Sequence, residues 1–224
     1  MMRFRRPSRD RPFHDRIDAG QQIAALLAPI LAHLSPMDLV VLGLARGGVP
    51  VAAEIAQRFG CALDACVVRK IGAPGQPELA IGAIAPSDTR VLNRSLIADL
   101  GLTDAAVEQL SWSASQERDR IDQRIRGGAA LPPLRDRIVV LVDDGLATGA
   151  SMQAAVASTK ASDPRRIVVA VPVAPPQLID DFRSGGVDAV SIVVPATFGS
   201  VGQFYEDFSE VTTDTVRRLL ADRR

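Results

Sequence analysis

The sequence predicts an α/β protein built on a doubly wound, mostly parallel β-sheet. Short apolar runs rich in β-branched residues alternate with helical patterns along the chain, an order of elements that is typical of parallel sheets. Two of these runs, at 39–42 and 139–142, lead directly into a glycine-containing turn and then a helical segment. Such corners lie at the carboxyl edge of a sheet, where open α/β sheets bind their ligands.

The first part of the chain supplies two helices and two strands of this pattern. Apolar residues recur at helical spacing over 16–34, with Pro29 as a candidate kink. The strand at 39–42 follows. After its turn, the pattern predicts a helix over 49–59 and a strand over 62–68.

The middle of the chain is less regular. The Gly- and Pro-rich residues 70–80 predict a loop, followed by short strands at 80–85 and 89–92. A long polar helix is predicted over 103–126, with Thr103 as its N-cap. We expect Trp112, on this helix, to be a packing residue.

The last part of the chain repeats the alternation, and we expect a single domain over 16–224, preceded by a mobile arm over 1–15. The predicted elements after the strand at 139–142 are helices over 152–161, 176–184 and 213–222 and strands over 166–171 and 189–194.

The composition excludes several classes of protein. Hydrophobic residues make up 47% and charged residues 23%, as in ordinary globular proteins. The 26 basic and 26 acidic side chains balance, which argues against a nucleic-acid partner because duplex binding normally needs a basic face. No apolar run is long enough for a membrane span, so we expect no membrane partner. Cys61 and Cys66 suit a reduced, cytoplasmic location.

The most informative segment runs from Val139 to Ser151. Asp143 and Asp144 end its apolar strand, and a small turn containing Gly, Thr and Ser opens the next helix. A helix N-terminus offers unpaired N–H groups and a partial positive charge, which bind phosphate. The carboxylates suit sugar hydroxyls, a hydrated Mg²⁺ or both. The combination indicates a phosphorylated sugar as ligand, and the plain alternative is a strand–helix corner with solvated acids.

This segment resembles the phosphoribosyl-diphosphate (PRPP) signature of type I phosphoribosyltransferases. The resemblance implies the fold of that family with a small cap (hood), and a Mg²⁺-dependent transfer of the phosphoribosyl group from PRPP to a nitrogenous acceptor. It implies that Asp143 and Asp144 hold the ribose and, through water, Mg²⁺. The residues that it implies for the 5′-phosphate are Ala147, Thr148, Gly149, Ala150 and Ser151.

A second strand-to-helix turn spans 43–48. It lacks both the Lys-Ser/Thr ending of a P-loop and the G-x-G-x-x-G spacing of dinucleotide-binding proteins. A tight turn with one guanidinium suits an anion, although a simple structural turn is the alternative. Members of the family resembled carry a diphosphate loop here, often with a cis non-proline peptide, and the matching residues are Ala45, Arg46 and Gly47.

Two more site residues are implied by the resemblance. Arg69-Lys70 is similar to a pair that opens a mobile loop over the diphosphate in orotate-type members, so Lys70 joins Arg46 as a candidate for diphosphate binding and catalysis. The alternative is a solvated surface pair. Phe198 lies where purine-type members place an aromatic ring on the acceptor base, and a core phenylalanine is the alternative there.

One position departs from the purine-salvage members. They have an aspartate that acts as a base where this chain has Ala147, which cannot transfer a proton. The acceptor is therefore open among orotate, uracil, a purine or another nitrogenous molecule. A non-catalytic sensor of PRPP or nucleotide is the alternative function, and a phosphosugar hydrolase is a weaker one because its usual motifs are absent. Since members of this family are often dimers, a homodimer is one expected assembly.

Overall fold

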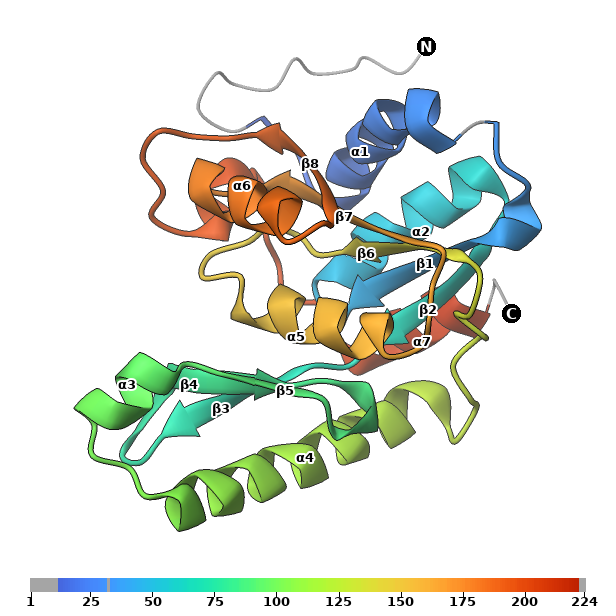
Figure 1. Ribbon diagram of the computed structural model, residues 1–224. Coiled ribbons are helices and arrows are strands. Elements are labelled where there is room, and N and C mark those ends of the chain that lie inside the picture. The colour runs from blue at the N-terminus through green and yellow to red at the C-terminus, as the bar shows by residue number, and fades with distance from the viewer. Residues whose placement is uncertain (1–11, 32, 222–224) are drawn as a thin grey trace.

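The computed structural model describes residues 12–31 and 33–221 and is built around a five-stranded parallel sheet (Figure 1). The strand order is β2-β1-β6-β7-β8, and every neighbouring pair is parallel. This confirms the predicted α/β class with a mostly parallel sheet. The strands are β1 Leu39–Leu44, β2 Ala62–Cys66, β6 Ile138–Val142, β7 Arg166–Val173 and β8 Asp188–Val193.

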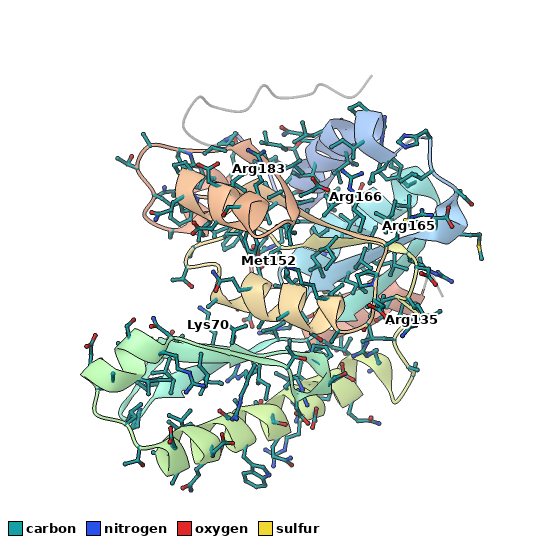
Figure 2. All side chains as sticks on the ribbon, viewed as in Figure 1. Lys70, Arg135, Met152, Arg165, Arg166 and Arg183 are labelled. Atoms are coloured by element: carbon teal, nitrogen blue, oxygen red, sulfur yellow. The ribbon has the colours of Figure 1, made fainter. Side chains whose placement is uncertain are left out.

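Helices cover both faces of this sheet. On one face, alternate strand residues such as Val41 and Val140 pack with α1 (Arg16–Leu31), α2 (Gly48–Phe59) and α7 (Thr213–Ala221). On the other face, the intervening residues pack with α5 (Ala150–Lys160) and α6 (Pro176–Ser184). Met152 of α5 is fully buried there (Figure 2). Burial on both faces explains why β1 and β6 are apolar throughout.

A second, antiparallel sheet of three strands packs on the far side of α5 (Figure 1). Its strands are β3 (Arg69–Ala73), β4 (Gln76–Ile84) and β5 (Arg90–Leu92). The long helix α4 (Asp104–Arg126) and the short helix α3 (Arg94–Asp99) pack against it through the core around Ile71, Ile81 and Ile97. Helix α5 is therefore held between two sheets.

The expectation of a loop over 70–80 is wrong, because these residues form the hairpin of β3 and β4. Gly75, at φ 72°, provides the left-handed backbone of the turn. Gly72 faces Pro77 so closely that a Cβ would lie 2.6 Å from the proline carbonyl oxygen. Glycine and proline thus mark one tight turn and one close approach between strands.

The N-terminal segment of the described chain is packed against a segment near the C-terminus. Phe13 is fully buried and pairs with Tyr205, and its N–H donates to the carbonyl oxygen of Phe204. The N–H groups of Glu206 and Asp207 donate to the carbonyl oxygens of residues 13 and 14. Residues 13–15 of the expected mobile arm are therefore part of the folded body, whereas 1–11 lie outside the described residues.

The other sequence expectations have mixed outcomes. Thr103 caps α4 by accepting from the N–H of Ala106, as predicted. Trp112 is 66% exposed, so the expectation that it packs is wrong.

Within the residues described, none of the helices has the length and apolar content that crossing a bilayer would require. The described residues also contain three short 3-10 helices: η1 Pro36–Asp38, η2 Pro86–Asp88 and η3 Val201–Phe204.

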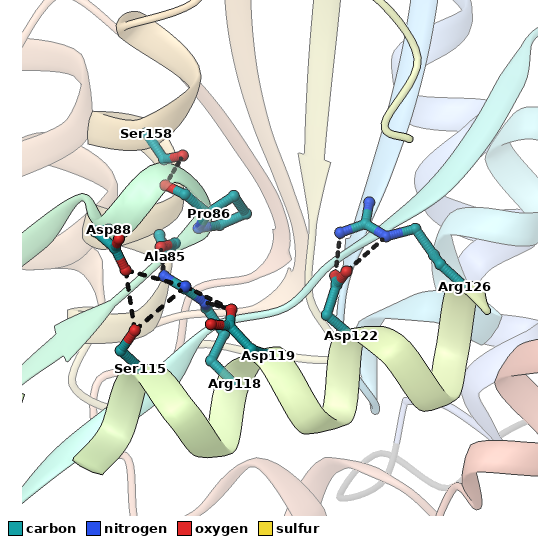
Figure 3. Close-up of polar contacts among 9 residues, drawn as sticks. All are labelled: Ala85, Pro86, Asp88, Ser115, Arg118, Asp119, Asp122, Arg126 and Ser158. Carbon is teal, nitrogen blue, oxygen red and sulfur yellow. Dashed lines mark hydrogen bonds and ion pairs between the residues drawn. The ribbon is translucent and has the colours of Figure 1, made fainter. Parts of the chain in front are cut away.

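The second sheet is attached to its helices by a buried arginine (Figure 3). Arg118 of α4 is buried, and it donates to the carbonyl oxygen of Ala85 at 2.6 Å and to the carboxylate of Asp88 at 3.0 Å. On the other side of this segment, the hydroxyl of Ser158 in α5 donates to the carbonyl oxygen of Pro86 at 2.9 Å. The connection from β4 to β5 is thus bonded to both helices that enclose the sheet.

We expect Arg118→Met to lower the free energy of unfolding by about 1–3 kcal/mol, because it leaves the buried carbonyl of Ala85 without its donor. Urea denaturation followed by far-ultraviolet circular dichroism measures this change. The matched control is Arg120→Met, since Arg120 is exposed and pairs with Glu117 only across 3.7 Å. The control should change the free energy by less than about 0.5 kcal/mol. Equal effects of the two variants would contradict the role given to Arg118.

Candidate functional site

The site lies where the chain changes direction across the sheet. Strands β1 and β6 are neighbours, with Gly43 opposite Val142, so they end at the same level. From β1 the chain passes through α2 to β2 on one side, and from β6 it passes through α5 to β7 on the other. Ligands of open α/β sheets bind at this kind of switch point. The two turns singled out in the sequence therefore meet at one place.

Two glycines allow these turns to touch. A Cβ on Gly47 would lie 2.1 Å from Oδ2 of Asp144, and a Cβ on Gly48 would lie 2.4 Å from the carbonyl oxygen of Val142. Both distances are far below normal contact. The expected diphosphate loop is thus packed directly against the acidic pair, and any larger residue at either position would separate them.

The backbone of the first turn has the form that the family resemblance implies. The peptide bond between Ala45 and Arg46 is cis. The N–H of Ala45 donates to the carbonyl oxygen of Cys66 at the end of β2. The N–H of Val49 donates to the carbonyl oxygen of Arg46. The turn is therefore tied both to the neighbouring strand and to the first residues of α2.

Asp143 and Asp144 lie side by side at the end of β6, and neither side chain is fully exposed. The Asp143 carboxylate accepts from the N–H of Asp144 at 2.9 Å. Burial, followed by the charge of Asp144, raises the pKa of Asp143 well above its usual range. Burial also raises the pKa of Asp144, while the charge of Arg16 opposes this rise. The pair is therefore short of hydrogen-bond donors and positive charge, which a polyol or a cation would supply.

The turn after the acidic pair leads into the N-terminus of α5. Ala147 and Thr148 are exposed, Gly149 has φ 74°, and α5 begins at Ala150. Because Gly149 has no side chain, it cannot cap the first N–H groups of the helix. These groups and the adjacent Ser151 form a backbone cradle of the kind that binds phosphate. The residues predicted for the 5′-phosphate are thus contiguous and lie beside the acids.

The two predicted basic residues come from different sheets. Arg46 is exposed and pairs with Glu210 at 2.6 Å. Lys70 lies on β3 of the small sheet, not on a loop, and its side chain is labelled in Figure 2. Its charge is the smallest of the influences on Asp143, and it lowers the pKa of that carboxyl.

Phe198 belongs to an aromatic cluster beside the site. Its ring stacks on that of Phe204 with 5.7 Å between centroids, and it packs with the buried group that contains Phe13 and Tyr205. It is partly exposed. The geometry favours a packing role, and contact with an acceptor stays a prediction.

The structure adds three residues that sequence reasoning did not identify. Arg16, the first residue of α1, pairs with Asp144. The Tyr205 hydroxyl donates to the carbonyl oxygen of Asp144 at 2.6 Å, and burial raises the pKa of this hydroxyl, so it stays a neutral donor. Glu210 holds Arg46. Arg16 lies next to the arginine-rich N-terminal residues and Tyr205 lies in an aromatic run, so neither has a local motif.

The acidic pair fits a magnesium ion that the substrate helps to hold. Asp143 and Asp144 offer carboxylate oxygens, the donor type that Mg²⁺ prefers. In the part of the chain described here, no group of three or more His, Cys, Asp or Glu side chains is placed to bind a metal. Mg²⁺ commonly uses only one or two carboxylates and completes its shell with water and substrate phosphates, which agrees with this donor set.

Two curated proteins of Mycobacterium tuberculosis are similar to this chain. They are named "Putative phosphoribosyl transferase" Rv0571c (strain H37Rv) and MT0597 (strain CDC 1551), and each is 43% identical over 208 residues. The match covers 93% of this chain and 46% of each relative. The chain thus spans about half the length of these relatives.

Solved structures agree with this likeness. The crystal structure of TT1426 from Thermus thermophilus is 40% identical with a TM-score of 0.78, and the match covers 94% of this chain and 98% of that one. The AQ2163 protein from Aquifex aeolicus shares the fold at 13% identity and a TM-score of 0.51, over 79% and 73% of the two chains. The family model described as "Phosphoribosyl transferase domain" matches residues 14–208. The chain belongs to the phosphoribosyl transferase domain family.

Proposed function

We propose that this protein transfers the phosphoribosyl group of PRPP to a nitrogenous acceptor of the nucleobase class and releases diphosphate. The observation that carries this proposal is the meeting of three elements at one switch point. The acidic pair, the N-terminus of α5 and the turn around Arg46 lie together because Gly47 and Gly48 permit contact between the two turns. Membership of the phosphoribosyl transferase domain family supports it.

The residues divide according to the parts of the substrate. Asp143 and Asp144 would accept hydrogen bonds from the ribose hydroxyls, as ionised carboxylates do. The backbone of residues 147–151 would hold the 5′-phosphate at the start of α5. Ala45, Arg46 and Gly47 would bind the diphosphate, with Lys70 adding positive charge from the second sheet. Both ends of an activated pentose would then be fixed.

The chemistry asked of these residues is positioning and neutralisation of charge. The bond between C1 of the ribose and the diphosphate oxygen breaks while the acceptor nitrogen forms a bond to C1, and the electron pair leaves with the diphosphate. Arg46 and Lys70 would stabilise the charge that develops on the leaving group. Asp143 and Asp144 would hold the ring for attack. Mg²⁺, held through water by these two carboxylates, would supply further positive charge at the diphosphate.

The acceptor is the least specified part of this proposal. Ala147 cannot remove a proton from a base, so the acceptor must already carry a nucleophilic nitrogen or lose its proton elsewhere. Phe198, beside the site, is the candidate for contact with its ring. The lack of a base at Ala147 favours a second candidate function, in which the same residues bind PRPP or a nucleotide as a sensor without turnover.

Titration calorimetry with PRPP and Mg²⁺ tests the binding step. We expect wild-type protein to bind PRPP, and Asp144→Asn to bind it about tenfold or more weakly, because a charged acceptor of the ribose hydroxyls is lost. Omission of Mg²⁺ should also weaken binding. Folding should be preserved in the variant, as judged by circular dichroism. Equal affinity of the wild type and Asp144→Asn would remove the ribose role, and no binding at millimolar PRPP would reject the proposed function.

Diphosphate release across a panel of nucleobases separates the two candidate functions. We expect release with at least one base, with its rate reduced in Asp144→Asn because the ribose is no longer fixed. Binding of PRPP with no diphosphate release in the presence of any of the bases would favour the sensor function.

Gly47→Ala tests the contact between the turns. The new methyl group overlaps the Asp144 carboxylate, so we expect the free energy of unfolding to fall by about 1–3 kcal/mol and PRPP affinity to fall with it. Urea denaturation and calorimetry measure the two effects. The matched control is Gly185→Ala in the turn before β8, where φ is −77° and the nearest atom to a Cβ is 3.3 Å away. PRPP binding that is unchanged in Gly47→Ala would show that the two turns need not touch.

A further inference from the structure

Arg16 makes a close ion pair with Asp144, although it lies outside both of the turns predicted to bind the ligand. It is the first residue of α1, and its side chain is 11% exposed. Its Nε donates to Oδ2 of Asp144 at 2.8 Å, and its Nη2 lies 2.8 Å from the same oxygen. Two guanidinium nitrogens therefore converge on one carboxylate oxygen, in a charge-assisted contact that is stronger than a hydrogen bond between neutral groups.

The guanidinium is itself held from two other sides. Its Nη1 donates to the carbonyl oxygen of Ser209 at 2.8 Å, and its central carbon lies 3.9 Å from the centre of the Phe208 ring. All three nitrogens are thus engaged with the protein, and one face of the group is covered by an aromatic ring. Arg16 has little freedom to turn toward a ligand.

The other oxygen of the Asp144 carboxylate is in a different situation. Both contacts from Arg16 reach Oδ2, and neither reaches Oδ1. The backbone of Asp144 is fixed as well, because its carbonyl oxygen accepts from the Tyr205 hydroxyl. Arg16 therefore holds one oxygen of the carboxylate and leaves the other outside its ion pair.

We propose that Arg16 is a positioning residue for ribose binding, which holds the Asp144 carboxylate so that Oδ1 is presented to a ribose hydroxyl. This inference rests on the proposed function, since it gives Arg16 a task only if Asp144 binds the pentose. Arg16 acts through Asp144 and does not contact the substrate. The segment that contains Phe208 and Ser209 keeps the guanidinium in place.

The first experiment compares ligands that contain ribose with one that does not. Calorimetry is carried out on wild-type protein, Arg16→Met and Arg16→Lys with PRPP and Mg²⁺, with ribose 5-phosphate, and with diphosphate and Mg²⁺. In Arg16→Met, which keeps an apolar stem for Phe208, we expect the affinity for PRPP and ribose 5-phosphate to fall roughly tenfold to a hundredfold. Diphosphate affinity should change by less than about twofold.

Arg16→Lys should lose less affinity than Arg16→Met, because an ammonium keeps the charge but cannot reproduce the paired donors of a guanidinium. This variant also keeps the inference testable if Arg16→Met does not fold. The matched control is Arg166→Met, which removes another Arg–Asp pair, 2.6 Å long, at the opposite edge of the sheet (Figure 2). It should bind all three ligands as the wild type does.

The second experiment is a double-mutant cycle between Arg16→Met and Asp144→Asn. If Arg16 acts only through Asp144, the double variant binds PRPP no more weakly than Asp144→Asn alone. A purely structural effect of Arg16 would add to the effect of Asp144→Asn.

Three results would overturn the inference: wild-type affinity for PRPP in Arg16→Met, an equal loss for diphosphate, or additive losses in the cycle. The first leaves the proposed function intact, provided that the wild type binds PRPP. The second would place Arg16 in direct contact with the leaving group. Failure of wild-type protein to bind PRPP would reject the proposed function and this inference together.

Discussion

The site depends on a close contact between two strand–helix turns. Because β1 and β6 are adjacent and end at the same level, the turns that follow them compete for the same space. Both turns fit because Gly47 and Gly48 have no side chains, so the first turn can lie against the backbone and carboxylate of the second. The turn predicted to bind diphosphate, the pair of acids and the N-terminus of α5 are thereby brought together at one end of the sheet. If the strand order did not reverse between β1 and β6, the two turns would not meet at a switch point.

Two charged side chains of the site, Asp144 and Arg46, already have partners of opposite charge within the protein. Arg16 offsets Asp144, and Glu210 offsets Arg46. Asp143 differs, because its carboxylate accepts from the N–H of Asp144 and burial raises its pKa. The diphosphate of an incoming phosphosugar would therefore replace Glu210 as the partner of Arg46. The sugar hydroxyls and any accompanying cation would supply the hydrogen-bond donors and positive charge that Asp143 lacks. This exchange favours a ligand that is both anionic and rich in hydroxyl groups.

The parts of the fold that the sequence can predict are those with local signals. The apolar runs of β1 and β6, the glycines after them and the Thr103 cap each depend on a few neighbouring residues. The sequence of the β3–β4 hairpin predicts a loop, because Gly and Pro are common both in tight turns and in loops. The segment forms strands because Ile71 and Ile81 are buried in the core of the small sheet. Trp112 does not pack, because it is five residues after the buried Val107 and lies off the buried stripe of α4.

The residues that orient the site could not be predicted because they come from distant segments. Arg16 and Asp144 are 128 positions apart, and Tyr205 is 61 positions beyond Asp144. The segments around Phe13 and Phe204 pair with each other and so bring both residues to the acids. A strand, two acids and a small turn are enough to predict which groups would meet a ligand, because they lie within one stretch of sequence. The direction in which an acid points is fixed by residues that only the complete fold brings together, so the motif predicts a ligand class but not the geometry of the carboxylates.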